Sequence, residues 1–451
     1  MLHRRFIAAR WIMDSLADKD KMTPYLRPGY RWYVLGLLTL VYAFNFIDRQ
    51  VLVIVQEQIR EELGLMDWQL GMLSGFVFAV FYSILGVPIA HWSESIGRKR
   101  VVSMSLAFWS LMTALMGAAQ NFLQLALLRI GVGVGEAGGS PPSHSIISDI
   151  FPRKRRAFAL SVFSMGVYFG YLLAYSLGGW VGEALGWRLT FMVVGLPGVL
   201  IALLVAWSIK EPPRGLAESG YKPKLLDSAH KDETTPAFSE TLRHLWAQRS
   251  FRYLALAGSF QSLAGYGVGN FMPSFIIRAH DMSIGDIGWR LALITGLGGA
   301  IAIAVSGYVT DRLSLRSQKW YALFPAYAIG VTLLLAPLVF LTESTGIMFL
   351  GYIPYEFLGA TWLGASLAIT HSLVGLRQRA VASAVLFFLI NLIGLGLGPL
   401  LIGMISDLLR PALGDADGLR YAILSTALVA KSLCVVHFLL AARALEKELT
   451  T

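Results

Sequence analysis

Twelve long apolar stretches constrain the fold of this chain more than any other feature of its sequence. A helix needs roughly 20 mostly apolar residues to cross the hydrocarbon core of a bilayer. Only 15% of the 451 residues are charged, against roughly 25% in soluble proteins. The pattern therefore predicts an all-α membrane protein and not a soluble protein with a large core. The predicted spans are 32–55, 68–92, 101–119, 122–147, 157–180, 188–208, 251–277, 287–309, 320–341, 346–371, 381–405 and 421–442.

The 38 basic residues are sorted by the side of the membrane on which the connections between spans lie. Twenty-nine of them fall in the two terminal segments and in, or at the edge of, the connections on the same side. Because cytoplasmic loops are enriched in Lys and Arg, both termini are predicted to be cytoplasmic. This sorting accounts for the net charge of +10, so we expect no nucleic-acid partner. The six on the opposite side are Arg60, Arg188, Arg278, Arg290, Arg410 and Arg420.

A long polar interruption at 209–250 divides the spans into two groups of six. It contains four prolines and mixed charges, which indicates a linker. The single cysteine, Cys434, excludes a disulfide within the chain, and we expect a monomer. The predicted segments are a cytoplasmic N-terminal segment (1–31), a six-helix bundle (32–208), the cytoplasmic linker (209–250), a second six-helix bundle (251–442) and a cytoplasmic tail (443–451).

The two halves of the chain look like repeats of one another. After the second span an acid is followed by basic residues, and the same order recurs about 217 positions later, after the eighth span. The basic residues hold such a loop in the cytoplasm, and the acid can cap or pair with a neighbouring helix end. The same offset brings Glu136 of the fourth span close to Glu356 of the tenth. The loop residues are Glu94, Arg98 and Lys99 in the first half, and Asp311, Arg312 and Arg316 in the second.

Six charged residues lie well inside the predicted spans, more than four residues from either end, and their charges sum to zero. A bare charge in hydrocarbon costs at least ~2.5–3.5 kcal/mol. We therefore expect these side chains to find partners in the interior of the bundle. The acids are Asp48, Glu136 and Glu356, and the bases are Arg49, Arg129 and Lys431.

These charges suggest a proton switch. Burial favours the protonated form of a carboxylic acid, whereas a nearby arginine favours the carboxylate, and the two effects are of similar size. We predict that Asp48 and Glu136 carry the proton and that Arg49 and Arg129 are their alternating partners. The alternative is a static cluster of salt bridges that only fixes the packing of the helices.

Polar residues at helical spacing predict a substrate cavity between the halves. Tyr42, Asn45 and Arg49 share one face of the first span, because they are three and four residues apart. Simple hydrogen bonding between helices is the alternative role, above all for Asn45 and Asn391. The weaker candidates for the cavity are Tyr42, Asn45, Tyr266, Asn270, Tyr352, Glu356 and Asn391.

The six-plus-six arrangement, the linker and the acid-then-basic loops resemble the major facilitator superfamily. The first loop departs from the family pattern, because Ala90, Glu94 and Ser95 stand where that pattern has Gly, Asp and Arg. The resemblance implies that both loops gate the conformational change. Two further stretches resemble the spinster family. The first is 45–49, and the second is 129–137 followed by 147–151. Spinster-type proteins are implicated in moving lysolipids and sphingosine phosphates, and bacterial relatives look proton-driven.

The resemblance and the charges together lead to one main hypothesis. We expect a proton-coupled secondary transporter of an amphiphilic lipid, of the lysophospholipid or sphingoid-phosphate type, that works by alternating access in a bacterial inner membrane. The alternative is a proton-coupled symporter of a small organic anion such as a sugar acid. A membrane enzyme or receptor is disfavoured, because the chain has no catalytic motif. We expect no metal and no cofactor apart from the proton, and the partners are the substrate and the bilayer.

Overall fold

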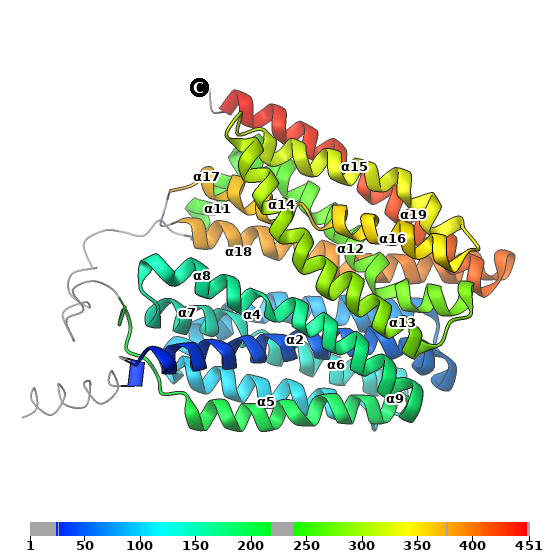
Figure 1. Ribbon diagram of the computed structural model, residues 1–451, viewed down its shortest axis with the longest axis horizontal. Helices are drawn as coiled ribbons and strands as arrows, with labels where there is room; N and C mark the ends of the chain where they lie inside the picture. Colours follow the sequence, from blue (N-terminus) through cyan, green and yellow to red (C-terminus); the bar gives the residue numbers. More distant parts are fainter. Residues whose placement is uncertain (1–23, 26, 218–237, 376–377, 449–451) are drawn as a thin grey trace, which may run out of the picture.

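The computed structural model describes residues 24–25, 27–217, 238–375 and 378–448, and these are wholly helical apart from short connections (Figure 1). The α-helices of the first half and the linker are α2 (Pro28–Leu63), α3 (Asp67–Gly71), α4 (Val77–Ile96), α5 (Arg98–Met116), α6 (Phe122–Glu136), α7 (Ser140–Ile150), α8 (Arg153–Ser164), α9 (Gly166–Ser208) and α11 (Phe238–Ala247). Those of the second half are α12 (Arg249–His280), α13 (Ile284–Leu291), α14 (Gly299–Ser314), α15 (Trp320–Leu341), α16 (Thr345–Gly359), α17 (Leu363–Ser372), α18 (Arg379–Leu389) and α19 (Gly398–Glu448). Three π-helical segments are η1 (Met72–Phe76), η2 (Ala292–Gly298) and η4 (Ile390–Leu397).

The helices fall into twelve spans in two halves of six, which confirms the predicted fold class. In each of the helices α9 and α19, the end of one span continues into the next span at a single glycine. Gly186 in α9 has φ 76° and Gly414 in α19 has φ 84°. Both angles lie in a region that glycine adopts at little cost and other residues avoid. Among the described residues, six helices are long and apolar enough to cross a membrane by length and composition, and these two are among them.

Several helices extend beyond the apolar stretches that predicted them. The first span was predicted from residue 32, but α2 begins at Pro28, a residue favoured in the first turn of a helix. The twelfth was predicted to end at 442, but α19 continues to Glu448. Hydropathy marks the part of a helix that lies in hydrocarbon, whereas the helix itself can continue into the polar interface. Residues 1–23 and 26 of the predicted cytoplasmic N-terminal segment lie outside the described residues, as does 218–237 of the linker.

The fourth and tenth spans are each broken near their middle. The fourth span consists of α6, which ends at Glu136, and α7, which begins at Ser140. The tenth consists of α16, which ends at Gly359, and α17, which begins at Leu363. The two breaks thus occupy corresponding positions in the two halves.

The two halves pack closely at the end of the bundle opposite the start of α2 and the end of α19 (Figure 1). We call this the distal end; α2 runs toward it and α19 turns there at Gly414. A Cβ placed on Gly71 would lie 2.3 Å from the carbonyl oxygen of Pro399, and one on Gly403 would lie 2.3 Å from that of Asp67. These contacts between backbones require glycine, so the sequence itself permits the close approach.

Candidate functional site

An ion pair between Arg49 and Glu136 lies at the centre of the N-terminal half. Nε of Arg49, on α2, donates to Oε2 of Glu136 at 2.6 Å, at the point where α6 ends. The glutamate is completely buried and the arginine nearly so. The charges of Arg49 and Glu136, which would each be costly in hydrocarbon, therefore neutralise each other inside the protein.

Aromatic rings surround the guanidinium of Arg49. Its Cζ atom lies 4.9 Å from the ring centroid of Phe46, 4.6 Å from that of Phe78 and 4.7 Å from that of Tyr82. Tyr42, one of the predicted cavity residues, lies in the same region and stacks on Phe163 with the centroids 4.5 Å apart. The site therefore combines a charged pair with a largely apolar, aromatic lining.

Arg129 contacts backbone carbonyls and forms no ion pair with Glu136. Its Nε donates to the carbonyl oxygen of Leu73 at 3.0 Å, and its Nη1 donates to that of Asp48 at 3.1 Å. Leu73 belongs to the π-helical segment η1, in which the usual helical pairing of carbonyls is altered. Arg129 therefore links α6 to α2 and η1, and it remains electrostatically coupled to Glu136 and Asp48.

The side chains of Asp48 and Asn45 are buried without hydrogen-bond partners. Both carboxylate oxygens of Asp48 and both amide atoms of Asn45 lack a partner, as does Oε1 of Glu136. Trp109 and Thr113 lie near Asp48 but outside hydrogen-bond geometry. Buried polar groups are usually satisfied, so this concentration of unsatisfied atoms distinguishes the site from the rest of the half.

The predicted cavity residues of the C-terminal half occupy different environments. Tyr266 of α12 lies near Arg49 of the other half. Asn270 instead joins the halves directly, because its Nδ2 donates to the carbonyl oxygen of Ser74 at 3.2 Å. The main-chain carbonyl oxygen of Asn270 accepts a hydrogen bond from Nε2 of Gln56 at 2.6 Å.

The remaining predicted residues of that half lie on two other spans. Tyr352 and Glu356 lie on α16. The ring of Tyr352 stacks against that of Tyr355, with the ring centroids 6.1 Å apart. Asn391 is half-buried in η4.

The two predicted gating loops differ sharply from one another. Arg98 is buried, where its Nε donates to Glu211 at 2.8 Å, its Nη2 donates to the carbonyl oxygen of Pro212 at 2.6 Å, and it pairs with Asp149. The backbone of Lys99 also donates to Glu211, at 2.8 Å. The side chain of Glu94 lies outside what the structure describes.

The second loop is exposed and less connected. Asp311 accepts a hydrogen bond from the hydroxyl of Tyr321 at 3.2 Å, and Arg312 lies over the ring of Tyr308. Arg316 is exposed. The repeated sequence pattern thus gives an extensive network in the first half and a looser loop in the second.

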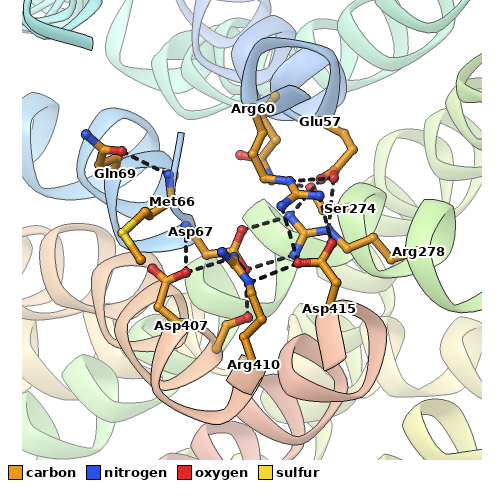
Figure 2. A network of polar contacts seen from close by, with 12 residues as sticks. Glu57, Arg60, Met66, Asp67, Gln69, Ser274, Arg278, Asp407, Arg410 and Asp415 are labelled. Carbon is orange, nitrogen blue, oxygen red and sulfur yellow. Dashed lines mark hydrogen bonds and ion pairs between the residues drawn. The ribbon is translucent and has the colours of Figure 1, made fainter. Parts of the chain in front are cut away.

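A charged network, which we call the distal network, joins the two halves at the distal end (Figure 2). Arg278, at the end of α12, forms two hydrogen bonds with each of two acids of the other half. It bonds Glu57 of α2 at 2.9 and 2.8 Å, and Asp67 of α3 at 2.8 and 2.7 Å. All three side chains are at most 5% exposed, so the pairs are shielded from solvent and from screening by salt.

Further charges extend the distal network around Arg278 (Figure 2). Arg60 pairs with Asp415 at 2.7 Å. Arg410 pairs with Asp67 at 3.0 Å and with Asp407 at 2.8 Å. The backbone amides of Asp67 and Trp68 donate to Asp407 at 3.1 and 2.8 Å.

Sequence reasoning treated the arginines of the distal network only as markers of topology. A usable signal was present, because Arg60 and Arg278 occupy the ends of the first and seventh spans at nearly the offset that relates the two loops. This recurrence marks Arg60 and Arg278 as corresponding positions of the two halves.

Comparisons with known proteins agree with this architecture. The family model described as Major Facilitator Superfamily matches residues 38–399. An MFS-type efflux pump of Mycolicibacterium smegmatis is 32% identical over 401 residues, which cover 88% of this chain and 89% of that protein. The chain therefore belongs to the major facilitator superfamily and is an integral membrane transporter.

Similarity within the superfamily narrows the type. A solved bacterial homologue of the human lysosomal transporter Spinster, in an inward-facing and unoccupied conformation, matches with a TM-score of 0.85 and 30% identity. The match covers 93% of this chain and 98% of that one. A sphingosine-1-phosphate transporter of Mus musculus is 27% identical over 412 residues, 87% of this chain and 73% of that protein. The chain is a transporter of the spinster type.

Another relative has a different named substrate. A probable galactarate/D-glucarate transporter of Bacillus subtilis is 27% identical over 312 residues, which cover 65% of this chain and 67% of that protein. Relatives of similar identity thus have substrates as different as a sphingoid phosphate and a sugar acid.

Proposed function

We propose that this protein is a proton-coupled transporter of an amphiphilic lipid with an anionic head group, of the lysophospholipid or sphingoid-phosphate type. The observation that carries the proposal is the Arg49–Glu136 pair inside its aromatic lining. A guanidinium suits a phosphate or carboxylate, and the rings beside it suit the apolar part of the same molecule. The similarity to the solved Spinster homologue supports this assignment.

The proton would act on the acids next to this arginine. A buried carboxylate without hydrogen bonds is costly, and both oxygens of Asp48 are in that position. The neutral acid avoids this cost, so Asp48 can hold a proton in the present arrangement. Protonation of Glu136 would remove the charge that holds Arg49, which would then be free to bind the head group of the lipid.

The distal network would set the direction of access. The excess of basic residues supports cytoplasmic termini, and the distal end would then face the periplasm. With Arg278 bonded to Glu57 and Asp67, that end would be closed and access would be from the cytoplasm. Alternating access then requires the halves to rock until these bonds break. We place the protein in a bacterial inner membrane.

A second candidate function is the symport of a small organic anion. The similarity to the probable galactarate/D-glucarate transporter favours it, and the same arginine could bind a carboxylate. This candidate differs from the first in one respect, because the cargo would have no apolar part for the rings around Arg49.

Reconstitution into liposomes with an imposed pH gradient distinguishes the two candidates. The assay follows a fluorescent lysophosphatidic acid, a fluorescent sphingosine phosphate and radiolabelled glucarate in parallel. The proposal predicts movement of at least one lipid that stops when a protonophore dissipates the gradient. Gradient-driven uptake of glucarate without movement of either lipid would contradict it in favour of the second candidate.

A further inference from the structure

A second buried charge lies in the C-terminal half, at Lys431 of α19. Its side chain is nearly inaccessible, with 2% exposed. Nζ donates to Oγ1 of Thr332 in α15 at 3.1 Å and lies 3.4 Å from the ring centroid of Tyr355 in α16. Lys431 lies midway between the Gly414 kink and Glu448, so the ammonium is near the middle of the membrane.

The charge of Lys431 is only partly compensated. Glu356 is electrostatically coupled to it, but among the described residues no carboxylate oxygen lies within 4.0 Å of Nζ. Thr332 contributes an oxygen but no charge, and its own hydroxyl donates to the carbonyl oxygen of Ile329 at 2.6 Å. A buried ammonium normally has a closely bonded counter-ion, so Lys431 retains the capacity to bind an anion.

Other polar groups around Lys431 also have unused hydrogen-bonding capacity. The hydroxyl of Tyr355 and Oε1 of Gln261 are buried without a partner. Nε2 of Gln261 donates to the carbonyl oxygen of Gly359 at 2.9 Å. A Cβ placed on Gly359 would lie 3.9 Å from Nζ of Lys431. The free groups therefore gather around the last residue of α16.

The position of this cluster matches that of the Arg49–Glu136 pair. Glu136 is the last residue of α6, at the break of the fourth span, and Gly359 is the last residue of α16, at the break of the tenth. Helices that are interrupted at corresponding positions of two repeats form the midplane binding sites of many transporters. Lys431 thus supplies a cation at the second of two related breaks.

We propose that Lys431 and the hydroxyl of Tyr355 form an anion-binding subsite for the cargo. The ligand group is a carboxylate or a phosphate, which accepts a charge-assisted hydrogen bond from the ammonium and a second bond from the tyrosine. The inference rests on the proposed transport function and adds a contact in the half opposite Arg49. The competing role for Lys431 is purely structural, as the charge that balances Glu356 and the carboxyl end of α16.

Two substitutions separate these roles. Lys431→Met removes the charge and keeps most of the length of the side chain. Tyr355→Phe removes only a hydroxyl that has no partner in the protein, so it leaves the thermal stability unchanged or raises it slightly. Lys319→Met is the matched control, because Lys319 pairs with Glu446 at 3.0 Å on the surface.

The experiment measures binding to the full chain in lipid nanodiscs by calorimetry. The probes are lysophosphatidic acid, disodium glucarate and inorganic phosphate, so that a lipid head group, a small carboxylate and a free phosphate are compared. At least one probe is expected to bind, with affinity at least about tenfold weaker in Lys431→Met and weakened to a smaller extent in Tyr355→Phe. Lys319→Met is expected to bind like the parent.

Three binding results would overturn the subsite. The first is unchanged binding of every probe by Lys431→Met, and the second is no binding of any probe by the parent. The third is a loss of binding and stability in Lys431→Met that Lys431→Met with Glu356→Gln restores, which would show that Lys431 only balances Glu356.

The lipid-transport proposal and the subsite proposal can be contradicted separately. If the parent binds glucarate or phosphate through Lys431 but moves no lipid in liposomes, the subsite stands and the lipid assignment is wrong. If Lys431→Met moves lipid with unchanged KM, the assignment stands and the subsite is wrong.

Discussion

The charged cluster at the centre of the N-terminal half and the distal network use the same kinds of residue in opposite ways. In the centre, Arg49 has one ion pair, while both carboxylate oxygens of Asp48 and one of Glu136 have no hydrogen-bond partner. In the distal network, Arg278 bonds two acids twice each. Asp67 is bonded in addition by Ser406 at 2.6 Å.

This difference indicates a division of labour between the two clusters. A buried polar group without a partner costs about 1–3 kcal/mol, so the central cluster can gain by rearranging or by taking up a proton. The bonds of Arg278 to Glu57 and Asp67 have little to gain from rearrangement and hold the two halves together. We propose that the central cluster is the switch and that the distal network is the lock that the switch must open.

The largest effect is expected from the acids of the central cluster. Asp48→Asn and Glu136→Gln should each reduce transport driven by a pH gradient to the level of empty liposomes, because the amide cannot carry the proton. Asp67→Asn is the matched control, since it weakens the distal network but should retain coupling to the proton. Gradient-driven transport that survives in both central variants would exclude the switch.

The next effect is expected from Arg278. Replacing it by Ala leaves Glu57 and Asp67 buried without their main partner, which should destabilise the closed distal end by about 3–5 kcal/mol. Distances between spin labels across the distal end should report a shift to the open form. Arg290→Ala is a suitable control, because Arg290 pairs at the surface with Asp286, within its own helix α13. Equal shifts in both variants would show that the distal network does not lock the halves.

A smaller effect is expected from the packing beneath the distal network. Gly71→Ala places a methyl group against the carbonyl oxygen of Pro399 and should disfavour distal closure by about 1–3 kcal/mol, as overpacking generally does. The same labels measure the change. Gly86→Ala is the control, since a Cβ at Gly86 meets nothing within 4 Å. If the two variants behave alike, the close approach at Gly71 does not limit closure.

The smallest effect is expected from Arg410. Its side chain is 27% exposed, against 5% for Arg278, and partly solvated ion pairs contribute about 1 kcal/mol or less. Arg410→Ala should therefore open the distal end only slightly, and high salt should reproduce part of its effect. If Arg410→Ala opens the distal end as much as Arg278→Ala does, the burial of an arginine does not determine how much it contributes to the distal network.

The sequence predicted the fold better than it predicted the pairing of the charges. Hydropathy is a local property, so the spans and their division into halves followed from it. The pairing depends on which helix faces lie together. Asp48 and Arg49 are adjacent in the chain, yet consecutive residues of a helix do not face one another, and Arg49 pairs with Glu136 of another helix. Arg278 was counted only as a topology marker, because its partners come from the other half of the chain.

The most direct test of the division of labour measures the distal end while the proton concentration changes. Spin labels at Glu61→Cys and Ala412→Cys, both exposed near the distal end, are introduced into a Cys434→Ala background, which removes the single native cysteine. We predict that the distance distribution shifts between acidic and neutral buffer in this parent. Asp48→Asn with Glu136→Gln should abolish the shift, and Arg278→Ala should give the open form in both buffers. A shift of the parent's size in the Asp48→Asn, Glu136→Gln protein would contradict the assignment of the switch to the central cluster.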